Sequence, residues 1–244
     1  MTDRPRLLCF SYAGGNAQTY VRWRRPLGEG VEVCPMQLPG HGERIGERPE
    51  HRWDALLDDV RTRLATMVDR PIALFGHSLG ALLAFESARM LVAEHGVQPV
   101  RLLVSGHRAP QLPMREEALH HLPDTEFLAK LSERSRTLRA LTDPGFRKLL
   151  LPILRADFTA SETYAFTEGP PLTCPVTALG GEEDRDAELA ELSEWRQHTT
   201  GGFELLAFPG DHFFVDDAWE TVVAAVGDRL RPRTGAAGAG RPRG

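Results

Sequence analysis

The fold of this chain is decided by the stretch Pro71-Ile-Ala-Leu-Phe-Gly76-His-Ser78-Leu-Gly80-Ala-Leu-Leu-Ala-Phe-Glu86. Its first part, residues 72–75, is a short apolar run of the kind that forms a buried parallel strand. Gly76 and Gly80 interrupt this run, and an apolar pattern then resumes and continues as a helix to about Glu94. A strand, a sharp turn and a helix in this order predict an α/β fold with a mostly parallel central sheet flanked by helices.

The turn contains the pattern G-x-S-x-G, with Ser78 between the two glycines. Between a strand and a helix, such a serine is held in a strained backbone conformation and presents its hydroxyl above the sheet. Side chains in place of the glycines would collide with the neighbouring strand and helix. The amide groups at the start of the helix, near Leu79, can stabilise an oxyanion. A glycine-rich turn with a solvent-facing serine is the alternative, but the surrounding strand and helix favour a nucleophile.

The length and composition are those of one domain. The 244 residues are enough for a single large core, and 41% hydrophobic and 26% charged residues are ordinary for a soluble protein. A net charge of −5 gives no indication of nucleic-acid binding. We find no secretion segment and no apolar run long enough to span a membrane, so we expect a cytoplasmic protein that acts without a membrane. The three cysteines are expected to be small buried apolar side chains, without a disulfide or a metal.

Further strands are predicted at residues 6–10, 31–38, 102–105, 176–179 and 203–208, and helices at 52–69 and 218–230. A glycine-rich loop, Ser11-Tyr-Ala-Gly-Gly15-Asn16, follows the first strand and is placed to supply a second amide to an oxyanion. Its glycines lack the G-x-G-x-x-G spacing of a dinucleotide-binding loop. His41 and Glu43 follow the strand at 31–38 without a third ligand in register, so we interpret them as loop residues and expect no metal.

Residues 107–168 break the alternation of strands and helices. Strand signals are absent there, and helices are predicted from Asp124 and over about 145–157, where Pro152 predicts a kink or a break. A helical insertion of this length predicts a lid over the active site, with a packing appendage as the alternative. We therefore expect one domain over residues 1–230, a lid at about 107–168 and a disordered tail at 231–244.

A serine nucleophile requires a histidine base and an acid that orients it. His212 is the one histidine of nine that lies just past the final predicted strand, with a glycine shortly before it. Glu182, Glu183, Asp184 and Asp186 share the loop after the preceding strand. Asp184 has the best offset from the strand end, with Asp186 as the runner-up, and Asp211 is too close to the histidine in sequence. Ser78, Asp184 and His212 follow the chain order of α/β-hydrolases.

The sequence resembles the type II thioesterases, the discrete editing enzymes of polyketide synthase and nonribosomal peptide synthetase pathways. The resemblance covers nearly the whole chain except the tail and is carried by Phe10-Ser-Tyr-Ala-Gly-Gly15, Gln37-Leu-Pro-Gly-His-Gly-Glu-Arg44, Gly76-His-Ser-Leu-Gly80, Leu151-Pro-Ile-Leu-Arg-Ala-Asp-Phe158, Ala178-Leu-Gly-Gly181 with Asp184, and Phe208-Pro-Gly-Asp-His-Phe-Phe214.

This resemblance implies the α/β-hydrolase fold and hydrolysis of acyl groups from the phosphopantetheine arm of a carrier protein. It places the nucleophile on Ser78, the acid on Asp184 and the base on His212, and the oxyanion-binding amides on Ala13 and Leu79. It implies acyl or peptidyl carrier domains as partners, no cofactor other than the arm that the substrate carries, and a lid at 107–168 that shapes the acyl pocket. We expect a monomer.

Three positions depart from the family pattern. Tyr12 stands where such proteins usually carry histidine or another residue. Asp211 replaces a common glycine, and its charge is expected to raise the pKa of His212. The stretch at 135–141 lacks a Gly-Thr-Pro-like turn. Without the resemblance, the residues support only a serine hydrolase or acyltransferase. A small-ester carboxylesterase, an acyltransferase and a non-catalytic binding protein of the same fold are the alternatives.

Overall fold

The computed structural model describes residues 4–115, 117–134 and 144–231. The predicted tail from residue 232 onward lies outside the described residues, and so does the lid stretch at 135–141.

Within the described residues, the core is one sheet of six strands, β1 (Arg6–Phe10), β2 (Glu32–Pro35), β3 (Ile72–His77), β4 (Arg101–Ser105), β5 (Val176–Gly181) and β6 (Phe203–Phe208). Their order is β2-β1-β3-β4-β5-β6, and every neighbouring pair is parallel, as the sequence predicts. The strand predicted at 31–38 is too long, because β2 ends at Pro35, which has no backbone N–H for the ladder. Parallel pairing brings the carboxyl ends of all strands to one edge of the sheet, where the predicted site residues follow.

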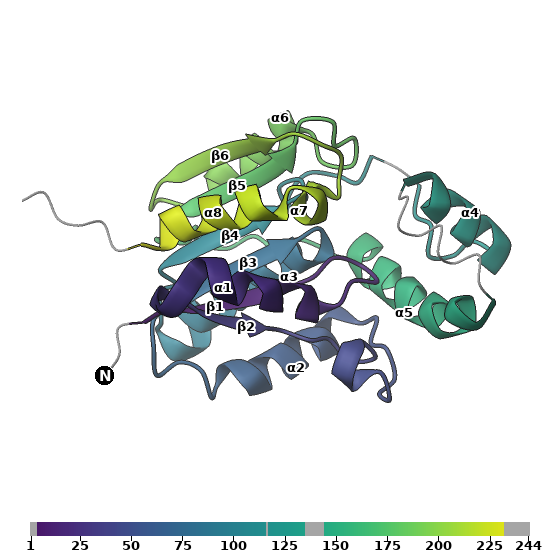
Figure 1. Cartoon of the computed structure of the whole chain (residues 1–244), viewed down its shortest axis with the longest axis horizontal. Helices are drawn as coiled ribbons and strands as arrows, with labels where there is room; N and C mark the ends of the chain where they lie inside the picture. The colour runs from purple at the N-terminus through teal and green to yellow at the C-terminus, as the bar shows by residue number, and fades with distance from the viewer. Residues whose placement is uncertain (1–3, 116, 135–143, 232–244) are drawn as a thin grey trace, which may run out of the picture.

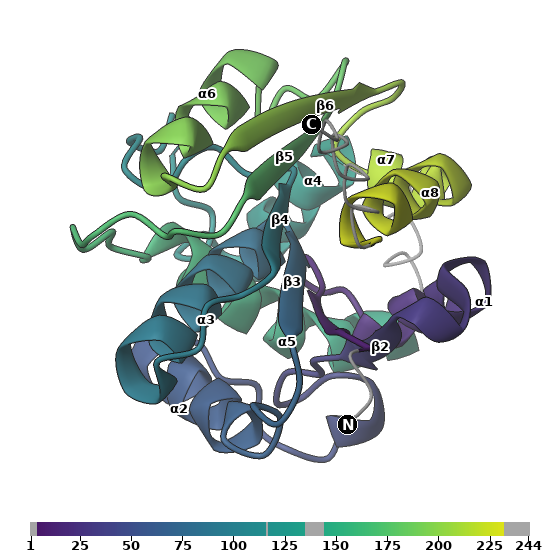
Figure 2. The same ribbon diagram turned by 90° about the vertical axis from the view of Figure 1, so that its left-hand side faces the viewer.

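Helices cover both faces of this sheet. One face carries α2 (Trp53–Leu64), α3 (Leu79–His95) and α6 (Leu189–Ser193), and the other carries α1 (Arg24–Leu27), α7 (Phe214–Asp217) and α8 (Trp219–Leu230), as Figures 1 and 2 show. Successive side chains of β3 point to opposite faces of the sheet. Leu74 packs in the apolar cluster under α2 and α3, and Phe75 packs in the cluster under α8. Burial on both faces explains why β3 reads as a continuous apolar run.

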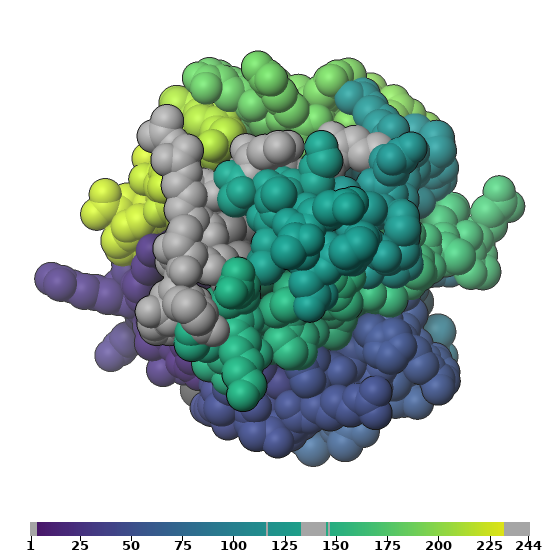
Figure 3. Space-filling model, turned by 90° about the vertical axis from the view of Figure 1, so that its right-hand side faces the viewer, coloured from purple at the N-terminus to yellow at the C-terminus, as the bar shows by residue number. Residues whose placement is uncertain are grey.

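The segment between β4 and β5 forms α4 (Asp124–Arg134) and α5 (Pro144–Glu162). The two helices lie beyond one end of the sheet (Figure 1) and cover that end of the molecule (Figure 3). They share an apolar cluster of their own, in which Phe127 and Leu131 of α4 pack with Leu154 of α5. The helix α5 continues through Pro152, so the break that this proline allowed does not occur. The proline removes one backbone hydrogen bond, while the buried residues that follow it hold the helix in place.

The cysteines are free: Cys9 and Cys174 are buried and Cys34 is half-buried. None of the helices in the described part of the chain combines the length and the apolar character that a membrane span requires.

Candidate active site

The turn between β3 and α3 holds Ser78 in a conformation that side chains rarely adopt. Its φ of 55° and ψ of −120° make it the one non-glycine residue with positive φ among the described residues. Its backbone N–H donates to the Ser105 carbonyl at 2.8 Å, which fixes the turn to β4. A Cβ at Gly76 would lie 1.8 Å from the Gly80 carbonyl oxygen, and a Cβ at Gly80 would lie 2.3 Å from the Phe10 carbonyl oxygen. Both flanking positions therefore require glycine, as the motif suggests.

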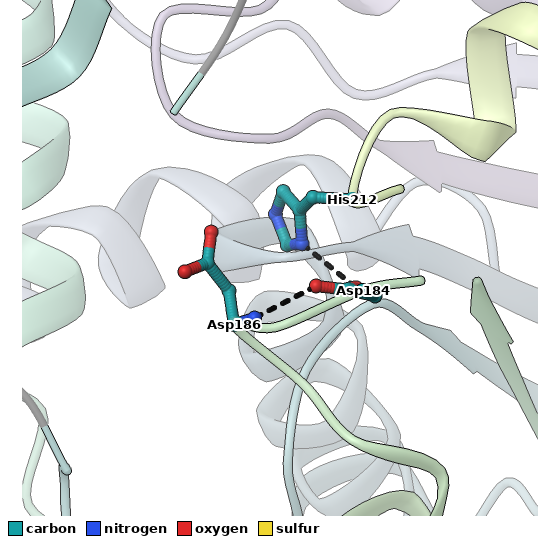
Figure 4. A group of neighbouring side chains, drawn as sticks. All are labelled: Asp184, Asp186 and His212. Carbon is teal, nitrogen blue, oxygen red and sulfur yellow. Dashed lines mark hydrogen bonds and ion pairs between the residues drawn. The ribbon is translucent and has the colours of Figure 1, made fainter. Parts of the chain in front are cut away.

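The ends of β5 and β6 bring Asp184 and His212 together. Gly181 and Phe208 are paired at the ends of these strands, and each strand leads into one of the two loops. The Nδ1 atom of His212 lies 2.9 Å from Oδ2 of Asp184, whose side chain is completely buried (Figure 4). A hydrogen bond at Nδ1 fixes the tautomer of the imidazole and leaves Nε2 able to accept a proton.

The loop also decides between the two candidate acids. Oδ1 of Asp184 accepts the backbone N–H groups of Asp186 at 2.9 Å and Ala187 at 3.2 Å, which fixes the carboxylate toward His212. Asp186 thus supports Asp184 through its backbone and does not replace it (Figure 4). The carboxylate of Asp211 accepts the N–H of Phe213 and lies outside this pair.

The acids around His212 favour its protonated form. Burial lowers the pKa of the imidazole, but the hydrogen bond and charge of Asp184 outweigh it, with smaller contributions from Asp186 and Asp211, so that the pKa is raised above 6.5. The expected influence of Asp211 therefore has the predicted sign and is secondary to that of Asp184.

Ser78, His212 and Ala13 line a single cavity of about 140 Å³. Leu131 of α4 and Phe158 of α5 line the same cavity, so the insertion supplies part of its apolar wall. A larger hollow of about 1250 Å³ adjoins this cavity and shares His212 with it.

One backbone amide directly follows Ser78 in the chain, and another belongs to a residue that lines the same cavity. Leu79 is the first residue of α3, where N–H groups have no partner inside the helix, and Ser78 does not cap that end. Ala13 lies in the loop after β1 and lines the cavity. Neither amide donates a hydrogen bond to an acceptor in the described parts of the chain. Both can therefore donate to a negatively charged oxygen bound to Ser78.

Other residues singled out by the sequence are held in specific contacts. The hydroxyl of Tyr12 donates to Asp216 at 2.7 Å, so this departure from the family pattern has a structural partner. His77 is fully buried, with Nδ1 2.8 Å from the Ser105 hydroxyl, and burial holds its pKa well below 6.5. His41 is more than a loop residue: it is 4% exposed, and its ring contacts the carboxylate of Asp157, which lies in the stretch 151–158 that carries the family resemblance.

Among the described residues, one group has the spacing to ligate a metal ion, namely Asp184, Asp186 and His212, whose ligand atoms lie within 4.8 Å of one another. The hydrogen bond between Asp184 and His212 already uses two of these side chains.

Comparison with known proteins gives a consistent picture. A family model described as the thioesterase domain matches residues 5–230. Thioesterase PikA5 of Streptomyces venezuelae is 41% identical over 233 residues, which are 95% of this chain and 83% of that protein. The protein named linear gramicidin dehydrogenase LgrE, of Brevibacillus parabrevis, is 40% identical over 237 residues, or 95% of this chain and 90% of that protein. The solved structure of the type II thioesterase BorB from the borrelidin biosynthetic cluster has 34% identity and a TM-score of 0.83, covering 94% of this chain and 92% of its own.

Proposed function

The chain belongs to the thioesterase family, and from that premise we propose that it removes acyl groups from the phosphopantetheine arm of carrier proteins in polyketide or nonribosomal peptide biosynthesis. The similar proteins include a thioesterase and a type II thioesterase from a biosynthetic cluster, which supports an editing role for this chain. The enzyme is a hydrolase of the α/β-hydrolase fold.

One observation carries the proposal: Ser78 and His212 line the same cavity, and Asp184 is hydrogen-bonded to Nδ1 of the His212 imidazole. In the reaction that we propose, Ser78 Oγ attacks the thioester carbonyl carbon while His212 Nε2 takes the hydroxyl proton. The carbonyl oxygen becomes an oxyanion, which the amides of Ala13 and Leu79 stabilise. Collapse of this intermediate breaks the C–S bond, and the sulfur leaves as a thiol with the proton from His212.

Deacylation repeats these steps with water. The imidazole of His212 takes a proton from a water molecule while the water oxygen attacks the carbonyl carbon of the acyl-serine ester. When the second tetrahedral intermediate collapses, the bond between that carbon and Ser78 Oγ breaks, and the His212 imidazolium returns the proton to Oγ. The products are a free carboxylic acid, the thiol of the arm and the original enzyme. This chemistry uses no cofactor besides the arm that the substrate brings.

The insertion at about 107–168 is proposed to be the lid of this site. Leu131 and Phe158 contribute to the cavity wall, so α4 and α5 help to enclose the acyl group, and a packing appendage would leave the wall to other elements. Exclusion of bulk water strengthens the electrostatic contacts of the reacting groups.

The test is intact mass spectrometry of a carrier protein loaded with an acetyl, propionyl or longer acyl group, incubated with the wild type or with Ser78→Ala. We expect the acyl mass to disappear with the wild type only, and Ser78→Ala to lose about three or more orders of magnitude in turnover. A fluorophosphonate probe labels a working serine nucleophile independently of the acyl carrier. Labelling of Ser78 without loss of acyl mass would contradict carrier-directed hydrolysis and favour an esterase or acyltransferase. Absence of both would contradict catalysis altogether.

A further inference from the structure

A buried carboxylate joins α5 to two loops outside the insertion. Asp157 is 2% exposed, and its Oδ2 accepts the backbone N–H of Gly14 at 2.6 Å. The same oxygen lies 2.8 Å from Nε2 of His41, which belongs to the loop after β2. A buried carboxyl group is costly unless hydrogen-bond donors surround it, and Gly14 and His41 contact this one.

The two ring nitrogens of His41 both face oxygen atoms. Nδ1 lies 2.9 Å from the Pro39 carbonyl, which can only accept, so Nδ1 carries a hydrogen. Nε2 faces the carboxylate of Asp157 and carries the second hydrogen. Burial lowers the pKa of His41, but its bonds to Asp157 and Pro39 outweigh burial and raise the pKa. The contact between His41 and Asp157 is thus a buried pair that favours the protonated imidazole.

This pair meets the loop after β1 at the peptide group next to Ala13. Gly14 has a φ of +73°, and a Cβ there would lie 2.3 Å from Cδ2 of Leu154, so the loop lies directly against α5. Within the loop, the N–H of Gly15 donates to the Tyr12 carbonyl at 2.8 Å and closes a tight turn. The turn at 12–15 is therefore a compact unit, and the contact with α5 sets how it lies over the cavity.

We propose that Asp157 and His41 are positioning residues for thioester hydrolysis. By holding the Gly14 peptide, the pair aims the neighbouring Ala13 amide at the oxyanion. The inference rests on the proposed function, in which that amide is one of the two donors. Neither Asp157 nor His41 lines the cavity that holds Ser78, so neither side chain touches the substrate.

The placement of Asp157 has a consequence for the insertion. It lies on α5, the helix whose Phe158 lines the cavity wall one position further along. The helix that encloses the acyl group is thus also the helix that holds the oxyanion loop.

The size of the effect follows from oxyanion chemistry. Donors must lie about 2.7–3.1 Å from the oxyanion, and removal of one costs about 100- to 1000-fold in kcat. A loosened donor is less damaging than a missing one, so we expect a loss of about 10- to 100-fold in kcat for Asp157→Asn. The donor acts mainly in the transition state, so KM should change by less than about threefold.

The experiment compares the wild type with Asp157→Asn, Asp157→Ala and His41→Gln. The readouts are kcat and KM on a propionyl-loaded carrier protein and the second-order rate constant for fluorophosphonate labelling of Ser78. Because phosphonylation also builds negative charge on an oxygen beside Ser78, labelling should slow in parallel with kcat. Asp157→Asn preserves the shape of the side chain, which keeps the test available if Asp157→Ala does not fold.

The matched control is Trp53→Phe. The indole N–H of Trp53 donates to the Ala160 carbonyl, so this variant also removes a hydrogen bond between α5 and the body of the protein, but one that does not reach the Gly14 loop. It should keep a labelling rate within about twofold of the wild type.

Three results would overturn the inference. Folded Asp157→Asn with wild-type kcat and labelling rate would show that the pair is structural only. A raised KM with unchanged kcat would place its effect on binding. Equal losses in Trp53→Phe would mean that any loosening of α5 has the same effect. A wild type that is neither labelled nor active would instead reject the proposed function, and the role of Ala13 with it.

Discussion

The strained conformation of Ser78 should be measurable as stability. Ser78→Ala and Ser78→Gly both remove the hydroxyl, but alanine keeps a Cβ at a φ of 55° and glycine does not. A non-glycine residue held in such a region costs about 1–3 kcal/mol. Glycine also destabilises the folded protein by about 0.4–1 kcal/mol, because it gives the unfolded chain more conformational freedom than alanine does. With the midpoints of these ranges, about 2 and 0.7 kcal/mol, we expect Ser78→Gly to be more stable than Ser78→Ala by about 1.3 kcal/mol.

Equilibrium unfolding in urea measures this difference directly, and thermal unfolding should show a shift of about 2–4 °C for each kcal/mol in a protein of this size. The control is the same pair of substitutions at Ser87, which is buried in the middle of α3. There glycine should be the less stable variant by about 1 kcal/mol, because the helix conformation suits alanine. If Ser78→Gly is no more stable than Ser78→Ala while the Ser87 pair behaves as expected, the turn stores no strain.

Three further outcomes are expected. Asp184→Asn should lower kcat by about 10,000-fold through loss of the correct imidazole tautomer, whereas Asp186→Asn, measured in the same assay, should keep most of the activity because its backbone still supports Asp184. The profile of kcat/KM should rise with pH through an apparent pKa above 6.5, the ordinary value for His212, since the base must be neutral. Asp211→Gly removes a negative charge near His212 and should therefore lower the apparent pKa of the kcat/KM profile. An unchanged apparent pKa would contradict the effect of Asp211 on His212. Gly80→Ala should lower the unfolding midpoint sharply or abolish soluble expression, because the added Cβ would collide with the Phe10 carbonyl. A midpoint equal to that of the wild type would show that the backbone can move to accommodate the Cβ.

The parts of this fold that the sequence predicts well are those with a local pattern. A continuous apolar run predicts β3, and the glycine spacing predicts the turn at Ser78, because both features need only adjacent residues. The loop that contains Asp184 follows from a strand end, and the structure then shows that Asp184 is the acid hydrogen-bonded to Nδ1 of His212.

The contact between His41 and Asp157 could not be predicted in this way, because 116 positions separate the two residues. A signal was present in part: Asp157 interrupts an apolar stretch of a helix, and carboxylates in such places are seldom buried without a partner. The partner itself depends on how α5 packs on the loops. The 3-10 helix at Ala17–Trp23 was not predicted, although its buried residues Ala17, Tyr20 and Trp23 recur at every third position, the repeat of a 3-10 helix.

The position of β1 has consequences for how this protein acquires its fold. Although it comes first among the strands in the chain, β1 lies inside the sheet between β2 and β3. During synthesis, residues up to 77 must be made before both edges of β1 are paired, and until then one edge has unpaired backbone N–H and C=O groups. Because parallel pairing requires long crossovers, this step is intrinsically slow. The glycine loop and the Ser78 turn therefore take shape together, when β3 docks on a strand that was made some sixty residues earlier.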